Sequence, residues 1–296
     1  MQSEPALWEL HHHTEEDWRR ILHSGPEPAA AWVHFAAERG FRAAQVVLGQ
    51  MYLDGHGVLR DTAAAYAWFE RAAAIGSLDA RNMLGRCHEL GWGVPIDHAA
   101  ALAHYRRAAD RGHAWGRYNV GCLLLYGNVP RDHAQAFVCF TQAAEAGHAK
   151  ASGMLGRCHE EGWGTPVNGV AAIDWYARAA EGGDAWGALN LGLIRAEAGA
   201  IAEAVSWLDR AIAMATPNCL AVIAETLIAH ADPALSQIGQ RAQAASFSIL
   251  DAHGPDPDLA GAPSPTTELG RGKSKRWGAG LFLSLGLLLM VHRVRR

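Results

Sequence analysis

Apolar and small residues recur along most of the chain at spacings of three and four, and glycines separate the runs. In one such run, the positions that share a helix face are Ala80, Leu84, Gly85 and His88. Gly91 and Gly93 follow, where a left-handed turn of the backbone can end the helix. A second apolar run begins after Asp97, a residue type that caps helix N-termini. The pattern predicts two helices joined by a glycine turn.

This helix pair recurs with a period of about 36 residues. The anchor of each first helix is an apolar residue followed by glycine, at Leu48-Gly49, Leu84-Gly85, Val120-Gly121, Leu155-Gly156 and Leu191-Gly192. The predicted caps of the second helices recur in phase, at Asp61, Asp97, Asp132 and Asn168. Alanine and glycine on the shared faces let helix axes approach closely. The expected fold is therefore all-α, built from repeated helix–turn–helix units.

Two stretches are nearly identical: residues 83–93 read MLGRCHELGWG and residues 154–164 read MLGRCHEEGWG. Each places Cys, His and Glu side by side, which raises the question of a duplicated metal or catalytic site. Equivalent positions two units apart in a stacked array lie roughly 20 Å apart, too far to share one ion. Adjacent residues of one helix point about 100° apart. We interpret the cysteine as a small buried filler and expect neither a metal site nor a catalytic one.

The clearest unit runs from Ala44 to Gly76. Its signature residues are Leu48, Gly49, Tyr52, Gly55, Gly57, Val58, Asp61, Ala65, Trp68, Phe69, Ala72 and Ala73. This pattern resembles the Sel-one-like repeat (SLR) family, a relative of the tetratricopeptide repeat, and the resemblance covers about residues 29–215. It implies a right-handed α-solenoid with a concave groove, in proteins that mostly act as adaptors. Some secreted bacterial relatives bind penicillin-like compounds, but their repeats carry a Cys pair spaced eight apart that this chain lacks.

A groove along the first helices is the expected place for a protein or peptide partner. Counted from the anchor glycine, positions −3, −2, +1 and +4 are expected on the face opposite the packed one. The predicted partner-binding residues are Asn82, Arg86, Glu89, Tyr118, Asn119, Cys122, Arg157, Glu160 and Asn190. Asn and Arg side chains there can hold a peptide backbone or a carboxylate. A solvated face without a ligand is the alternative interpretation.

Charge and cysteine content limit the kinds of function that this chain can have. The chain has 26 Lys and Arg against 30 Asp and Glu, a net charge of −4. Residues 271–296 hold seven basic residues and no acidic one, so the remainder carries 19 basic against 30 acidic residues, or −11. An acidic body disfavours nucleic-acid binding. Five cysteines without regular spacing indicate no disulfide framework and fit a reducing compartment.

The flanking regions change character. Residues 1–28 are expected to cap the repeats, residues 216–250 to form C-terminal capping helices, and residues 251–276 to be a disordered Pro-rich and basic linker. Residues 277–291 are uncharged and flanked by basic residues, which predicts a hydrophobic helix that anchors the protein to a membrane. As a helix this run is about 22 Å long against a hydrocarbon core of roughly 30 Å, so spanning and interfacial placements both stay open. The N-terminal sequence MQSEPALWEL predicts no signal peptide.

These features together predict a non-enzymatic protein-interaction scaffold without a cofactor. It is expected to be tethered to a membrane by its C-terminal tail, with the repeats in the cytoplasm; a wholly cytoplasmic protein is the alternative. A soluble single-partner regulator or immunity-type inhibitor is the second candidate, and a penicillin-binding or hydrolase activity ranks lower. The run His11–His13 is interpreted as a solvated local run rather than a metal site.

Overall fold

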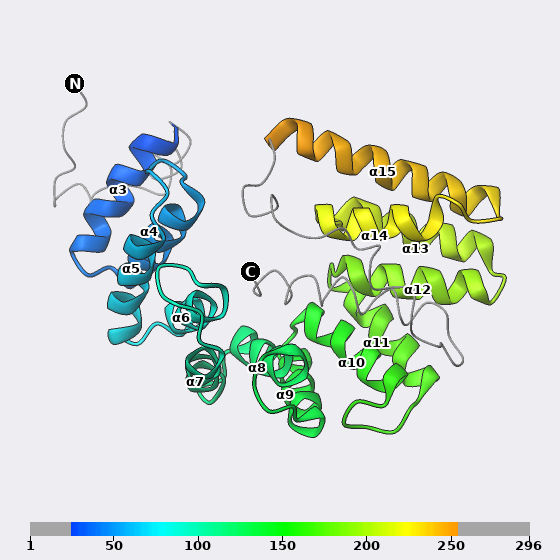
Figure 1. Cartoon of the computed structure of the whole chain (residues 1–296), viewed down its shortest axis with the longest axis horizontal. Helices are drawn as coiled ribbons and strands as arrows, with labels where there is room; N and C mark the ends of the chain where they lie inside the picture. Colours follow the sequence, from blue (N-terminus) through cyan, green and yellow to red (C-terminus); the bar gives the residue numbers. More distant parts are fainter. Residues whose placement is uncertain (1–24, 254–296) are drawn as a thin grey trace. The chain divides into compact units, whose positions relative to one another are not determined.

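A computed structural model describes residues 25–253 of the chain (Figure 1). Within this range the backbone forms thirteen helices and no strand, which confirms the all-α helix-pair repeat. The chain divides into two compact units at residues 123 and 124. The helices that begin in unit 1 are α3 (Pro26–Glu38), α4 (Arg42–Asp54), α5 (Thr62–Ala74), α6 (Leu78–Leu90), α7 (His98–Ala109) and α8 (Ala114–Tyr126), the last of which crosses the boundary. Unit 2 continues with α9 (His133–Glu145), α10 (Ala149–Glu161), α11 (Gly169–Glu181), α12 (Ala185–Glu197), α13 (Ile201–Met214), α14 (Pro217–Leu227) and α15 (Pro233–His253).

The second helix of each repeat begins where the sequence predicts a cap. The Asp61 carboxylate accepts hydrogen bonds from the backbone N–H groups of Ala63 and Ala64, both at 2.9 Å. Asp97, Asp132 and Asn168 accept equivalent bonds at the starts of α7, α9 and α11. Each bond satisfies a donor that has no partner inside the helix. The predicted caps are therefore confirmed.

The first helices end at glycines in the left-handed conformation. Gly55, Gly91 and Gly162 follow α4, α6 and α10 with φ angles of 68°, 75° and 74°. A side chain at such an angle would be strained, which is why glycine stands there. Each glycine also lets the helix close with a backbone bond to its last turn, as the predicted glycine turn requires.

In three of the repeats, a glycine of the first helix lies against an aromatic ring of the second. A Cβ atom on Gly85 would lie 2.5 Å from the Tyr105 ring, and one on Gly156 would lie 2.5 Å from the Tyr176 ring. Gly49 meets Phe69 in the same way. The rings of Phe69, Tyr105 and Tyr176 are fully buried. Close approach of the paired helices thus depends on the anchor glycine that marks the repeat in the sequence.

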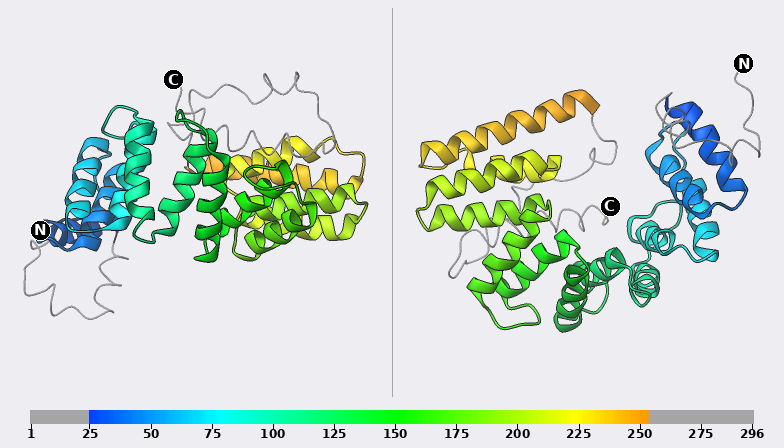
Figure 2. Two further views of the ribbon diagram at one scale, coloured as in Figure 1. Left: turned by 90° about the horizontal axis from the view of Figure 1, so that it is seen from below. Right: turned by 180° about the vertical axis from the view of Figure 1, so that it is seen from behind.

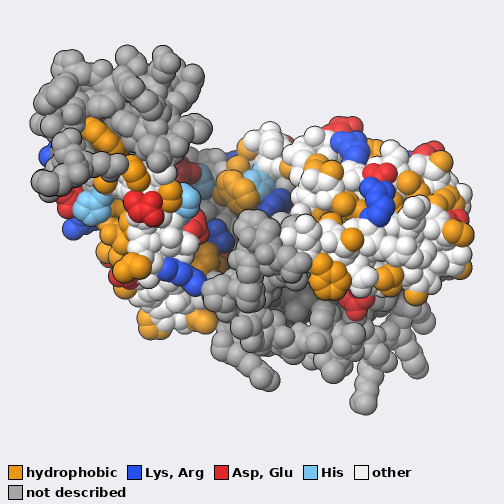
Figure 3. All heavy atoms as spheres, turned by 90° about the horizontal axis from the view of Figure 1, so that it is seen from above, with side chains coloured by type: hydrophobic (Ala, Val, Ile, Leu, Met, Phe, Trp, Pro, Cys, Tyr) orange, Lys and Arg blue, Asp and Glu red, His pale blue; other side chains and the backbone are white. Residues whose placement is uncertain are grey.

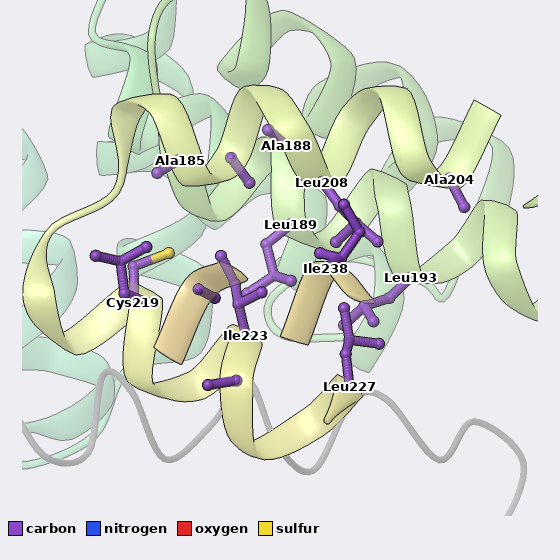
Figure 4. Close-up of a cluster of buried hydrophobic side chains, with 14 of the residues drawn as sticks. Ala185, Ala188, Leu189, Leu193, Ala204, Leu208, Cys219, Ile223, Leu227 and Ile238 are labelled. Carbon is purple, nitrogen blue, oxygen red and sulfur yellow. The ribbon is translucent and has the colours of Figure 1, made fainter. Parts of the chain in front are cut away.

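Each unit has its own hydrophobic core. In unit 1, α4, α5 and α6 share a cluster of buried residues that includes Leu53, Phe69 and Leu84. In unit 2, the largest cluster joins α12 and α13 to α14 and α15, with Leu189, Leu208, Ile223, Leu227 and Ile238 among its members (Figure 4). The paired helices lie side by side in each of the views of Figures 1 and 2. Packing between successive helices therefore builds each core.

Several predicted regions fall partly or wholly outside residues 25–253. Helices α14 and α15 follow the repeats in the region expected to cap them, and α15 continues to His253, past the predicted start of the linker. Most of the predicted N-terminal cap, the run His11–His13, the rest of the linker and the predicted anchor at residues 277–291 lie outside the described residues. No helix in the described part of the chain has the length and apolar character needed to cross a membrane. The right-handed superhelix stays a prediction.

The glycine–aromatic contact can be tested in unit 2 with two alanine substitutions. We expect Gly156→Ala to destabilise the unit by about 1–2 kcal/mol, because the added methyl group collides with the Tyr176 ring and the better helix propensity of alanine offsets only part of that cost. Gly169→Ala is the matched control, since a Cβ atom there meets nothing within 4 Å. It should leave stability unchanged or raise it by up to about 1 kcal/mol. Urea unfolding followed by circular dichroism measures both, and equal stabilities of the two variants would contradict the prediction.

Candidate functional site

The accessible face of the first helices is rotated from the one predicted. At about 100° per residue, positions −3 and +4 lie only about 50° from the anchor glycine, whereas positions −6 and +5 lie about 130° from it. The outward side of α6 accordingly consists of Asp79, Met83, Arg86 and Leu90, at positions −6, −2, +1 and +5. Positions −2 and +1 belong to the predicted face. Positions −3 and +4 turn instead towards the neighbouring helices.

Two predicted asparagines link successive repeats in unit 1. The Asn119 amide donates a hydrogen bond of 2.8 Å to the Asn82 side-chain oxygen, so α8 and α6 are tied together. Asn82 is buried and Asn119 half-buried. In unit 2, the predicted Asn190 is also buried, with 3 % of its surface exposed. Of these three residues, Asn119 has the greatest access to a partner.

The two predicted glutamates bond to the tyrosine that packs on the anchor glycine. Tyr105 donates a hydrogen bond of 2.5 Å to Glu89, and Tyr176 donates one of 2.6 Å to Glu160. Burial raises the pKa of Glu89 and that of Glu160, and the tyrosine hydrogen bond opposes this shift only in part. Both glutamates thus serve the packing of a first helix on its second helix.

The two predicted arginines stack on the tryptophan of the following loop. The Arg86 guanidinium lies 4.9 Å from the Trp92 ring centre, and Arg157 lies 4.9 Å from that of Trp163. Arg157 is 4 % exposed and donates a 3.1 Å hydrogen bond to the Tyr126 hydroxyl. Arg86 keeps partial exposure. The same motif therefore gives a buried arginine in unit 2 and an accessible one in unit 1.

An accessible surface, which we call the unit 1 stripe, runs over α4, α6 and α8. Its residues are Val47, Gln50, Met83, Arg86, Leu90, Trp115, Asn119 and Cys122. Val47 is 47 % exposed and Trp115 46 %, while Met83 and Leu90 are half-buried. The predicted Tyr118 lies beside the stripe, where its ring meets Trp115 edge-on with centroids 6.0 Å apart. The stripe thus combines apolar side chains with one arginine and two side-chain amides, and the exposed Asp54 and Asp79 border it.

At the corresponding positions of unit 2, the central residues are buried. Met154, Arg157, Asn190 and Leu193 are all buried. Lys150, Glu161 and Glu197 are exposed at the helix ends. Figure 3 draws one face of the molecule, on which hydrophobic and charged side chains are intermixed. At the central positions −2 and +1, accessible side chains are therefore a feature of unit 1, while Trp186 at position −6 of α12 is half-buried.

Sequence reasoning missed Val47, Met83, Leu90 and Trp115. Their spacing along α4, α6 and α8 carries the signal, because positions −6, −2, +1 and +5 follow the four–three–four step of one helix face. Val47 and Met83 stand at position −2 of the predicted face, whereas Leu90 and Trp115 stand one turn beyond it, at positions +5 and −6. The buried state of unit 2 has no such signal in the sequence.

The duplicated Cys–His pairs lie in the packed interior. Cys87 and Cys158 are fully buried, and burial raises the pKa of each thiol to about 12. His88 contacts Tyr66 and His104, whereas His159 packs edge-on against Phe137. Within residues 25–253, no three His, Cys, Asp or Glu side chains are grouped so that they could hold a metal ion. Both cysteines fill space, as the sequence interpretation proposed.

Comparison with solved structures places the fold among known Sel1-repeat proteins. A Sel1 repeat protein from Oxalobacter formigenes shares 23 % identity over 79 % of this chain and 99 % of its own, with a TM-score of 0.66. A protective antigen of uropathogenic Escherichia coli with an SLR fold shares 24 % identity over 79 % of this chain and 53 % of its own, with a TM-score of 0.56. An immunity protein from Pseudomonas aeruginosa shares 16 % identity over 75 % and 82 %, with a TM-score of 0.50. These likenesses show the fold alone.

Comparison at the level of sequence families agrees. No curated protein sequence is significantly similar to this chain. The Sel1 repeat family, in contrast, matches residues 42–77, 78–113, 116–148 and 149–184 in unbroken order. These four segments correspond to the helix pairs from α4 to α11 and end at Asp184, the N-cap of α12. The resemblance to the Sel-one-like repeat is thereby confirmed, and the chain is a Sel1-repeat protein with four Sel1 repeats.

Proposed function

We propose that this protein is a non-enzymatic protein-binding module and that the unit 1 stripe is its contact surface. The observation that carries the proposal is the exposure of Val47, whose equivalents Met154 and Asn190 in unit 2 are buried, together with the exposure of Trp115 at the start of α8. Apolar and aromatic side chains around a partly exposed arginine have the composition of interface centres. The repeat frame supports the proposal because stacked first helices present several such positions side by side.

The partner suited to this surface is a protein segment with apolar side chains and a carboxylate. Val47, Met83, Leu90 and Trp115 supply apolar contact area over three helices. The Arg86 guanidinium lies near the middle of the stripe and stacks on Trp92. An acidic side chain of the partner can pair with that guanidinium.

A single-partner inhibitor is the second candidate function. Solved neighbours with this fold include immunity proteins of Pseudomonas aeruginosa, at a TM-score of 0.50. Such an inhibitor would use the same surface, bind one protein in a fixed ratio and act without the C-terminal tail. The stoichiometry of a purified complex separates it from a scaffold with several partners.

Attachment to a membrane by residues 277–291 is a further part of the proposal. Its support is the sequence alone: an uncharged run with basic residues on both sides. The repeats would then act at a cytoplasmic membrane surface, while a cytoplasmic protein without attachment is the alternative.

Affinity capture of a partner with two variants, Val47→Glu and Leu59→Glu, tests the stripe. We expect Val47→Glu to weaken partner binding about tenfold or more, because a carboxylate is then buried in the apolar part of the interface. Leu59→Glu is the control, since Leu59 is 91 % exposed in the loop between α4 and α5 and lies outside the stripe. Calorimetry of each variant with the captured partner gives the affinities. Equal binding of the two variants would exclude the stripe as the contact surface.

Membrane attachment is tested by fractionating cells that express the full chain or a version ending at Gly270. The full chain should sediment with membranes and the shortened one should not, because only the former keeps the apolar run. A shortened protein that stays with the membranes would rule out the tail as the anchor. A full chain found wholly in the soluble fraction would rule out attachment itself.

A further inference from the structure

Two histidine rings meet where three helices of unit 1 pack together. His88 on α6 stacks on His104 of α7, with ring centroids 5.4 Å apart and planes 19° from parallel. On its other side, His88 Nε2 lies 3.4 Å from the Tyr66 hydroxyl of α5, and the two rings are edge-on. This cluster therefore joins the second helix of one repeat to both helices of the next.

Neither imidazole has an acceptor for a proton carried on Nδ1. The Nδ1 atoms of His88 and His104 are both buried, and neither has a hydrogen-bond partner among the described residues. A neutral imidazole can leave Nδ1 as an unused acceptor, but the imidazolium carries N–H on both nitrogens. Protonation would therefore bury a charged donor without an acceptor, against the face of a second imidazole ring.

Other repeats fill these positions without a second histidine. The residue equivalent to His104 is Trp68 in the preceding repeat and Trp175 in the fourth. The residue equivalent to His88 is Tyr52 in the first repeat. These positions thus accept large uncharged rings as well as the smaller Leu124 and Cys139 of the third repeat, so the contact needs packing rather than a histidine pair.

We propose that His88 and His104 form an acid-sensitive joint, which loosens the packing of α6 against α5 and α7 as the pH falls from neutral towards 5. The charged and titratable groups around the two rings come from all three helices and the α7 cap. Arg81 on α6 and Arg107 on α7 act on His104, Asp97 at the cap of α7 interacts with His88, and Glu70 on α5 and Cys87 on α6 act on Tyr66 beside His88. The arginines nearest His104 add repulsion to any positive charge there.

The lowered pKa of His104 supports a loss of stability as the pH falls. Burial first, and then the charges of His88, Arg107 and Arg81, lower it from 6.5 to about 4. Between pH 6.5 and about 4, His104 therefore binds a proton in the unfolded state but not in the folded state. Its contribution to the free energy of unfolding is complete above pH 6.5 and is lost as the pH falls towards 4. Since His104 is only half-buried, we expect about a tenfold shift of the opening equilibrium at pH 5.

The neighbouring groups act outside this window or in the opposite direction. Hydrogen bonds to the α7 backbone lower the pKa of Asp97 from 3.8, so its contribution is lost only at lower pH. Burial raises the pKa of Glu89, which stabilises the fold on acidification. Comparing the protein with a His104 variant cancels both effects, because each group is present in both proteins.

The joint has a consequence for the unit 1 stripe, and this consequence rests on the proposed function. Helix α6 carries His88 on its packed side and Met83, Arg86 and Leu90 on its outward side. Loosening α6 would disturb the middle of the stripe and weaken partner binding in acid. The joint itself needs no partner and can be tested without one.

The test is hydrogen exchange of the full chain at pH 7.5 and pH 5, followed by mass spectrometry and corrected for the pH dependence of intrinsic exchange. We expect protection of α5, α6 and α7 to fall about tenfold more in the natural protein than in His104→Trp, which places the tryptophan of Trp68 and Trp175 at this position. His56→Asn is the control, since His56 is exposed in the loop after α4 and its replacement should leave the acid response unchanged. Circular dichroism at pH 7.5 checks that each variant folds.

His88→Tyr removes the other histidine of the pair and introduces the residue type found at Tyr52. It tests the joint if His104→Trp fails to fold. Equal loss of protection in the natural protein and in a folded variant would overturn the joint. Loss of protection that depends on the histidines, together with partner binding that is unchanged at pH 5, would support the joint and remove its link to the stripe.

Discussion

The contact between a glycine of the first helix and an aromatic ring of the second sets the geometry of every Sel1 repeat in which it occurs. At Gly85 and Gly156 the space that a methyl group would need is taken by the ring of Tyr105 or Tyr176. That close approach fixes the rotation of the first helix about its own axis. The tyrosine hydroxyl then reaches Glu89 or Glu160, and the residues at positions −2 and +1 are left facing outward.

A fixed rotation of the frame lets other positions vary. The unit 1 stripe keeps Val47 and Trp115 accessible, while the equivalent centre of unit 2 is buried around Arg157 and Asn190. The stacked pair of His88 and His104 occupies positions that hold tyrosine or tryptophan elsewhere in the chain. Repeats with one backbone design thus differ in what they present and in what they bury.

Much of the fold could be read from the sequence because its determinants are local. Asp61 and Asp97 cap the helices that follow them, and Gly91 ends the helix before it, through contacts within a few residues. The candidate site was harder to predict, because the accessibility of its residues depends on how the helices are rotated and on what covers them. Asn82 and Glu89 were assigned to the open face, yet their partners Asn119 and Tyr105 come from other helices. The burial of Arg157 arises in the same way, since Tyr126 and Trp163 lie in other elements.

The buried thiols have a use of their own. Cys87 lies in the core of unit 1, and Cys158 and Cys219 lie in unit 2, each with its pKa raised to about 12 by burial. Because the thiolate is the reactive species, these sulfurs are inert to alkylating reagents until their surroundings open. With the half-buried Cys122 and Cys139 replaced, the rate of alkylation at each remaining sulfur would report how often its own unit opens. The alkylation rates of these cysteines would thus measure the local opening of each unit separately.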